Sequence, residues 1–491
     1  MTTDSTTAIA GDRRGDWLLR GAAPAAACLA AAIILLHGVL ILGGHWSVDE
    51  YVDLTFYRGF GIDWFLQRLK GWSPRPASEI ILYGYASSVL AMGSPLIAPF
   101  LAGLWALLAA CALLPVRPAL SGSGVFRLVA ATGVLAMFLL GHRIDDVFYV
   151  PWSAAAYLPA LAGVTLTCMT LVFASASRRR DHLVCCLGLS LAAASAETGL
   201  FAALGFGGLA LLWWGIARLR RVPSGPAAWF VIPLLIALAS MAVSAGTRVS
   251  HAVTPLMPDS VTFHRFGPSL IAALHDLPER LVGIGGMAAD LPLAPSVAMR
   301  ILLLLGLTLL CRAAMPTRLP PRDAAALVAG LLTSILLTSF AAHFQYGFSG
   351  FWRHGAFQQC MGLLLILVLG RLLGGLPVAP RHASGPPGAL CLIAALVLGM
   401  AWRLPDLLHD IRLLPDIRAA QAETLVSGID RSSNTMRFTL PPETRVLMNQ
   451  LPPGHYEEPA RPGAPSHFFA SAVLHYFGKS SVDVVPWPSD R

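Results

Sequence analysis

The sequence predicts an all-α polytopic membrane protein with about eleven transmembrane helices, and three observations support this. Of its 491 residues, 55% are hydrophobic and only 13% are charged, whereas a soluble domain carries about 25% charged residues. Several apolar runs reach the roughly 20 residues that a helix needs to cross a bilayer. Arginines gather in the short connections between these runs, as is typical of cytoplasmic loops. The composition disfavours disorder, a coiled coil and a nucleic-acid-binding module, so we expect no nucleic acid partner.

Each predicted span is an apolar run bounded by polar or turn-forming residues. One further stretch, residues 76–92, is ambiguous because it holds Glu79 and ends in a Gly-Ser-Pro break. If it crossed, arginine clusters such as Arg178–Arg180 would face outward, so we expect an interfacial helix there instead. The eleven predicted spans are residues 21–43, 96–115, 126–141, 152–175, 182–196, 199–217, 227–246, 294–311, 323–342, 355–374 and 387–403.

An odd number of spans puts the two termini on opposite sides of the membrane. Residues 1–20 form a basic tail that we expect in the cytoplasm, followed by the transmembrane domain, residues 21–403. The C-terminal segment, residues 404–491, is then outside, in the periplasm or the extracellular space. We expect a helix near residues 406–427 of this segment and strand-like pieces such as Arg445–Met448. The expected outer loops are residues 44–95, 142–151 and 247–293.

Acidic side chains follow the first and third spans on the outer side. Asp49 and Glu50 come directly after the first span, and Asp145 and Asp146 lie in the short second outer loop. One carboxylate of such a pair can hold a metal or orient a hydroxyl while the other accepts a proton. The alternatives are a polar helix end at the interface for the first pair and a solvated turn for the second.

Glu197 stands at the turn between two tightly joined spans. A carboxylate at that depth needs a partner from another helix or a water-filled cavity, and such residues are often functional. Tyr149 and Tyr157 follow the second outer loop and could form a wall on which a sugar stacks. An aromatic belt at the membrane interface would explain both rings equally well.

Basic and aromatic side chains also recur at the outer ends of the spans. A guanidinium suits a phosphate or a carboxylate, so these residues fit an anionic ligand. The alternatives are interface anchoring for the first pair and ion pairs with the outer acids for the others. The pairs are Trp72 with Arg75, Arg248 with His251, and Arg353 with His354.

In this order, the motifs resemble those of bacterial polytopic glycosyltransferases of the GT-C type, in particular the branch akin to O-antigen glucosyl transferases. The likeness rests on the acidic pair after the first span, a Trp-x-x-Arg, an interfacial helix, a second acidic outer loop and an outer tail. Shorter elements add to it, with Val150 and Ser153 departing from the branch's usual residues. These elements are Asp146–Tyr149 followed by Ser153 and Tyr157, Ser195–Glu197, Ala245–Arg248, and His467–Phe468 with Tyr476–Gly478.

The resemblance implies an enzyme of the bacterial inner membrane. It would move a sugar from a polyprenyl-phosphate-linked donor to a glycan or lipid acceptor on the outer face. Asp49 matches the family's first-loop catalytic acid and, if a divalent metal such as Mg or Mn takes part, its ligand. Glu50, Asp146 and Glu197 would be further catalytic residues, and the tyrosines, histidines, arginines, Trp72 and Asp145 named above would bind substrate.

Two other functions remain open. A flippase or other transporter of a lipid-linked anionic glycan would use the same arginines and Glu197, but it would need ionisable groups along both faces of a path and often shows inverted repeats. The inner loops are plain and no repeat is visible, which favours the enzyme. An O-antigen polymerase would use the outer arginines and would not need the acids of the first loop.

Overall fold

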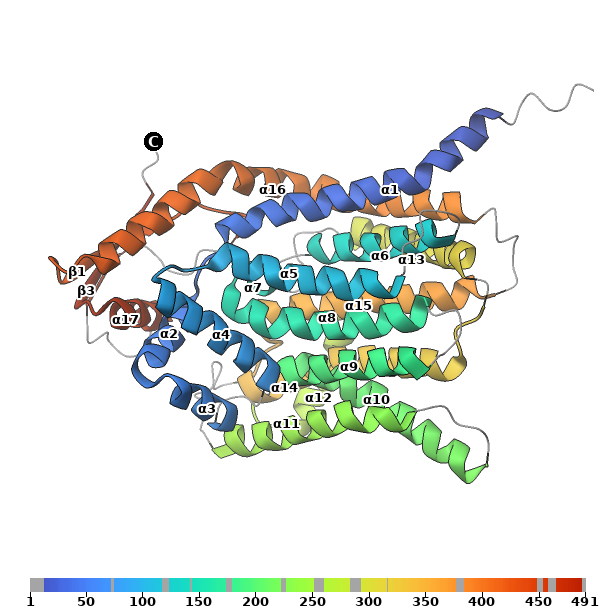
Figure 1. Ribbon diagram of the computed structural model, residues 1–491, viewed down its shortest axis with the longest axis horizontal. Coiled ribbons are helices and arrows are strands. Elements are labelled where there is room, and N and C mark those ends of the chain that lie inside the picture. The colour runs from blue at the N-terminus through green and yellow to red at the C-terminus, as the bar shows by residue number, and fades with distance from the viewer. Residues whose placement is uncertain are drawn as a thin grey trace, which may run out of the picture.

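Long helices lying side by side form most of the computed structural model (Figure 1). The structure describes residues 13–71, 75–116, 123–141, 144–173, 179–221, 227–250, 260–282, 293–315, 317–376, 384–447, 454–457 and 465–487. The long helices are α1 (Arg13–Leu40), α5 (Ile97–Leu113), α6 (Ser123–Leu139), α8 (Pro151–Phe173), α9 (Arg179–Ser195), α10 (Glu197–Leu219), α11 (Val231–Ser250), α13 (Leu293–Ala314), α14 (Pro321–Tyr346), α15 (Trp352–Gly374) and α16 (Gly385–Ile429).

A helix lies at each of the eleven predicted spans. Within the described residues, eight of these helices are long and apolar enough to cross a membrane, and α6 and α11 contain shorter apolar stretches. The chain is therefore a multi-pass membrane protein, while the count of eleven crossings stays a prediction. Helix α8 is almost completely buried within the bundle, as expected for a helix that is apolar all round. It packs closely on α9, since a Cβ at Gly163 would lie 2.2 Å from the carbonyl oxygen of Gly188.

The two ends of the helix bundle carry different elements (Figure 1). At one end, where α9 and α14 begin and where α10, α13 and α15 finish, each of these helix ends carries an arginine. The opposite end, called the loop end below, carries α2 (Val48–Phe60), α3 (Ile62–Gly71), α4 (Pro76–Met92) and the four-residue helix α7 (Asp145–Phe148). Helix α12 (Phe266–Val282) lies beside α14, and His343 contacts Asp276 across them.

Helix α4 keeps the chain at the loop end. Gly44, just after α1, lies against Ile97 and Leu101 at the start of α5, so α1 finishes where α5 begins. The middle of α4 is tied to the same place, because Trp46 Nε1 donates to Tyr85 Oη over 2.8 Å and Tyr85 Oη donates to the carbonyl of Pro95 over 2.7 Å. Residues 76–92 therefore form a helix at the loop end, and its position at the membrane interface stays a prediction.

The last predicted span and the helix expected near residues 406–427 form one helix. Helix α16 runs 45 residues without a break through Pro405 and Pro415 and carries the chain beyond the loop end (Figure 1). At its far end lie the strands β1 (Thr435–Leu440), β2 (Gly454–Glu457) and β3 (Ser481–Pro486) and helix α17 (Pro465–Phe477). The strand order is β1-β3-β2, with β1 parallel and β2 antiparallel to β3.

No strand forms over residues 445–447, where the sequence predicts one. The backbone N–H groups of Arg445, Val446 and Leu447 instead donate to the carboxylate of Asp410 over 2.8, 2.7 and 2.9 Å. Asp410 is completely buried in α16. Because three consecutive N–H groups point at one carboxylate, residues 445–447 curve around Asp410 instead of extending as a strand. The sequence pattern alone does not reveal this contact.

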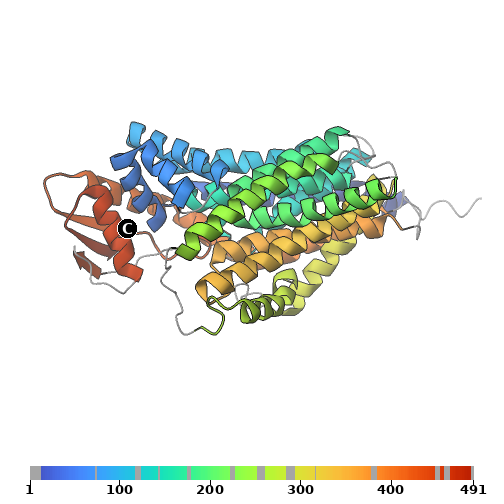
Figure 2. The same cartoon turned by 90° about the horizontal axis from the view of Figure 1, so that it is seen from below.

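The C-terminal segment shares a hydrophobic core with the helices that follow α1. Helix α17 packs on α2, and the ring of Tyr476 makes edge contacts with Trp46 and Tyr51 at 5.5 and 5.6 Å between centroids. Arg58 Nη1 in α2 donates to the carbonyl of Tyr476 over 2.7 Å. Figure 2 shows the strands and α17 together at the same end as α2 to α4. The predicted boundary at residue 404 therefore does not separate two independent cores.

Candidate functional site

The structure gathers predicted acids and arginines from six helices at the loop end. Asp49 comes from α2, Arg75 from the start of α4 and Asp146 from α7. Tyr157 lies in the second turn of α8, and Glu197 and Arg353 lie in the first turns of α10 and α15. We call these six residues the acid–arginine cluster. Its members lie far apart in the sequence, so the packing of the bundle alone brings them together.

Asp49 lies in the first turn of α2, where Ser47 is the N-cap. Its side chain is half-buried and interacts electrostatically with both Asp146 and Arg353. The N-terminus of a helix carries a partial positive charge, which stabilises a carboxylate in its first turn. Asp49 is therefore held beside two other charged groups while still accessible.

Asp146 and Arg353 form the first ion pair of the cluster. Arg353 Nη1 lies 3.9 Å from Asp146 Oδ2, and the guanidinium also stacks over the ring of Phe351 with 4.6 Å to its centroid. Burial raises the pKa of Asp146; the charge of Arg353 opposes this rise and that of Asp49 adds to it. An ion pair with so long a distance between nitrogen and oxygen is weak, and it leaves the guanidinium able to bind another anion.

Arg75 and Glu197 form the second ion pair, with 3.6 Å between Nη1 and Oε2. Arg75 is the N-cap of α4, and Pro76 starts the helix behind it. Glu197 starts α10 after an extended residue, Ala196. The tight turn between α9 and α10 depends on Gly199, because a Cβ there would lie 2.3 Å from the carbonyl oxygen of Ala192.

Tyr157 interacts with members of both ion pairs. It is buried, and its phenol interacts electrostatically with Arg353, Glu197 and Arg75. Its ring makes an edge contact with His354 at 6.0 Å. His354 Nδ1 accepts a hydrogen bond from the N–H of Phe351 over 3.1 Å, so this histidine helps to begin α15. The structure thus gives His354 a structural contact beside the cluster.

Glu50 makes contacts typical of a structural residue, whereas the sequence predicts a catalytic role for it. Its Oε2 accepts from the Ser47 backbone N–H and hydroxyl over 2.8 and 2.6 Å, and its Oε1 accepts from the Trp152 N–H over 2.7 Å. The carboxyl group is fully buried and joins the N-termini of α2 and α8. Both oxygens are therefore engaged within the protein, and we assign Glu50 to positioning Asp49.

The protonation of Glu50 predicts how stability depends on pH. Burial raises the pKa of Glu50 to about 8, against the hydrogen bonds from Ser47 and Trp152, which lower it. The folded state therefore keeps a proton that the unfolded chain releases near the ordinary value. Stability from this group is complete at acidic pH and is lost as the pH rises towards 8.

We expect the thermal unfolding midpoint of the wild type, measured in detergent between pH 5 and 8, to fall with rising pH more steeply than that of Glu50→Gln. The exposed carboxyl of Asp63 in α3 provides the control, and Asp63→Asn should follow the wild-type curve. Parallel curves for the wild type and Glu50→Gln would contradict the assignment.

Asp145 and Tyr149 face away from the acid–arginine cluster. Both are buried, and the Tyr149 hydroxyl is 2.8 Å from His37 Nδ1 in α1. Asp145 interacts electrostatically with Tyr149. This location is inside the bundle, so it does not fit the predicted roles of the two residues in binding substrate. Asp145 and Asp146 are adjacent in α7, and a helical turn points adjacent side chains in different directions. Asp145 therefore does not share the position of Asp146 in the cluster.

Three predicted residues cannot be placed at the cluster. Trp72 and His251 lie outside the described residues, and Arg248 is in the last turns of α11, where the structure describes the backbone only.

Sequence reasoning missed a buried ion triad beside the cluster. Arg68 donates to Glu79 with two nitrogens, over 2.8 and 3.0 Å, and its Nη1 donates to Asp53 over 3.1 Å. Trp64 Nε1 also donates to Asp53 over 2.8 Å. These contacts join α2, α3 and α4, and burial raises the pKa of Asp53 to about 7 although the charge of Arg68 lowers it. Asp53 follows Asp49 by one helical turn, a spacing that could have drawn attention to it.

The cluster is suited to proton transfer and to holding a phosphate. Asp49 is an accessible carboxylate, and Arg353 offers a fork of donors in a partly buried place where charge interactions are stronger than in water. In the described part of the chain, no group of three or more His, Cys, Asp and Glu side chains is arranged to hold a metal. Asp49 and Asp146 are two carboxylates, which matches the few protein ligands that Mg²⁺ usually takes when a substrate phosphate supplies others.

Comparisons with protein-family models, with characterised proteins and with solved structures find no significant match to this chain.

Proposed function

We propose that this protein is a membrane glycosyltransferase of the GT-C type in the bacterial inner membrane, with its N-terminus in the cytoplasm. It would move a sugar from a polyprenyl-phosphate-linked donor to a glycan or lipid acceptor outside. The observation that carries the proposal is the meeting of Asp49, Asp146 and Arg353 at the loop end of a multi-pass bundle. Separate or lipid-facing positions for these residues would have argued against it.

The proposed reaction is an inverting transfer in which Asp49 acts as general base. Asp49 takes the proton of an acceptor hydroxyl while that oxygen forms a bond to the anomeric carbon of the donor sugar. The bond from this carbon to the carrier phosphate breaks, and the departing phosphate keeps the electron pair. Arg353 would stabilise its growing negative charge, an interaction that is stronger in the transition state than before it.

The remaining members of the acid–arginine cluster would position these groups. Asp146 holds Arg353 and would also contact the acceptor, while Glu197 fixes Arg75 next to the phosphate. A divalent metal, if one takes part, would be held by Asp49 and Asp146 and would supply charge stabilisation for the phosphate.

The proposal is tested by replacing Asp49 with asparagine, which keeps the shape of the side chain and removes the base. We expect a deletion strain carrying Asp49→Asn, expressed at the wild-type level, to lack the modified glycan in mass spectrometry. Asp63→Asn in α3 is a matched control from the same loop and should restore the glycan fully.

An unchanged glycan with Asp49→Asn would overturn the proposal and favour an O-antigen polymerase, which does not need this acid. A transporter gives a different result. Deletion of the gene would then leave the chemical structure of the glycan unaltered and trap its lipid-linked precursor on the inner face.

A further inference from the structure

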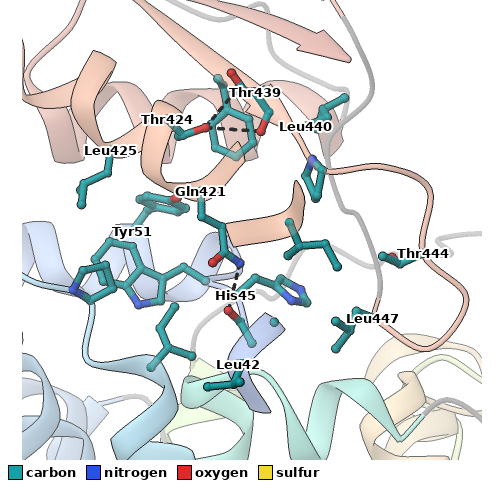
Figure 3. A pocket seen from close by; sticks show the side chains of 18 of the residues that line it. Leu42, His45, Tyr51, Gln421, Thr424, Leu425, Thr439, Leu440, Thr444 and Leu447 are labelled. Atoms are coloured by element: carbon teal, nitrogen blue, oxygen red, sulfur yellow. Dashed lines mark hydrogen bonds between the residues drawn. The ribbon is translucent and has the colours of Figure 1, made fainter. Parts of the chain in front are cut away.

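A cavity of about 220 Å³ lies at the loop end, between the end of α1, the extension of α16 and the strands (Figure 3). It could hold several water molecules, since one occupies roughly 30 Å³ in the liquid. None of the described residues of the acid–arginine cluster lines it. The backbone N–H of His45, which donates to the carbonyl of Tyr149 over 3.3 Å, joins the cavity wall to the buried side of α7.

Aliphatic side chains, aromatic rings and uncharged polar groups form the cavity wall. Among the described lining residues there is no Asp, Glu, Lys or Arg. Two polar contacts hold the wall together, because Gln421 Nε2 donates to the carbonyl of Gly44 over 3.0 Å and the N–H of Thr439 donates to Thr424 Oγ1 over 2.9 Å. The aromatic lining residues are Trp46, Tyr51, Phe438, Phe469 and Phe477.

Two buried polar atoms in this wall have no hydrogen-bond partner among the described residues. They are His45 Nε2 and Thr444 Oγ1, and Figure 3 shows both side chains around the cavity. Burial lowers the pKa of His45 to about 4. At neutral pH the imidazole is therefore uncharged, with one nitrogen that donates and one that accepts a hydrogen bond.

The wall is also fixed in place. A Cβ at Gly43 would lie 2.7 Å from a methyl group of Leu447 and 2.8 Å from a methyl group of Leu414, so the chain passes close to both side chains here. On the other side, the contacts from Asp410 hold residues 445–447. A cavity whose walls are held by buried contacts needs little rearrangement to receive a ligand.

These features discriminate between ligand classes. An anion would find no cationic side chain in the wall. A hydrocarbon tail would leave His45 Nε2 and Thr444 Oγ1 buried without partners, which is costly. A sugar ring has hydroxyls that can pair with both atoms and an apolar face that can lie against an aromatic ring.

We propose that this cavity binds one uncharged sugar unit. That the sugar belongs to the acceptor glycan rests on the proposed function. The site would hold the acceptor at a distance from the reacting hydroxyl, so that the C-terminal strands help to choose which glycan is modified. The aromatic core that α17 shares with α2 would keep this site fixed relative to Asp49.

The test uses the full-length protein in lipid nanodiscs and saturation-transfer NMR, with methyl β-glucoside, methyl β-galactoside and methyl α-mannoside as probes. Thr444→Val keeps the shape of the side chain and removes one hydrogen bond, so we expect about fivefold weaker binding of the preferred glycoside. Leu425→Trp fills the cavity and should abolish the signal. Thr132→Val is the matched control, since this residue lies in α6 and its hydroxyl bonds within its own helix.

Binding that is equal in the wild type, Thr444→Val and Leu425→Trp would overturn the proposal, as would wild-type protein that binds none of the three glycosides. Asp49→Asn separates this site from the proposed reaction. It should keep the glycoside signal although it loses transfer, and loss of the signal in this variant would place the sugar at the acid–arginine cluster instead of the cavity.

Discussion

Replacing Arg353 with glutamine is expected to lower the rate of glycosyl transfer roughly 10²- to 10³-fold, the usual effect of removing one group that stabilises transition-state charge. The side chain lies beside Asp146 and over Phe351, and it interacts with Asp49. Glutamine keeps a hydrogen-bond donor but removes the positive charge that the departing phosphate needs. The measurement is the initial rate of glycan modification in membranes with equal amounts of protein.

Arg322→Gln is the matched control for this experiment. Arg322 lies in the first turn of α14, at the end of the bundle opposite the cluster, where it pairs with Asp323 at 3.4 Å. Its loss should leave the rate unchanged. Arg353→Lys should be intermediate, because lysine keeps the charge without the planar fork of donors. A rate for Arg353→Gln within threefold of the wild type would rule out its role in the transition state.

Replacing Arg68 with methionine is expected to destabilise the protein by about 3–5 kcal/mol, as is typical when one partner is removed from a buried ion group. Asp53 and Glu79 would then face each other without a cation, and the contact of the guanidinium with the ring of Trp152, 4.6 Å from its centroid, would be lost. The thermal unfolding midpoint in detergent measures the effect.

Two further variants identify the cause of the destabilisation expected for Arg68→Met. Lys70→Met changes an exposed cation on the same helix and should have little effect. A triple variant, Asp53→Leu with Arg68→Met and Glu79→Leu, removes all three charges and should recover most of the stability, because no buried charge is left unpaired. If Arg68→Met unfolds at the same temperature as Lys70→Met, the triad does not hold α2, α3 and α4 together.

Much of the bundle could be predicted from the sequence because hydropathy is a local property. A run of apolar residues forms a helix in a membrane whatever its neighbours are, since its backbone groups must be paired within the segment. Arginine placement likewise indicated that residues 76–92 stay at one end, and α4 does so. The local pattern also pointed to Asp49, Asp146, Glu197, Arg75 and Arg353, which the structure brings into one cluster.

The partners of these residues could not be predicted, because they come from distant parts of the chain. Glu50 and Asp49 are neighbours with the same charge, yet only Glu50 lies at the N-terminus of α8 and is engaged by Trp152. Asp145 and Asp146 differ in the same way, with one facing Tyr149 inside the bundle and the other facing Arg353. A helical turn decides which of two adjacent side chains points to the cluster.

By itself, the sequence determined that this chain is a multi-pass helical membrane protein whose acids and arginines recur at the ends of its spans. The tertiary structure decided that α16 continues past the bundle, that α17 shares a core with α2, and that a cavity forms between them. The physical reason is the range of the forces involved. Apolar length and charge bias act on each segment alone, whereas ion pairs, shared cores and cavities depend on which segments meet.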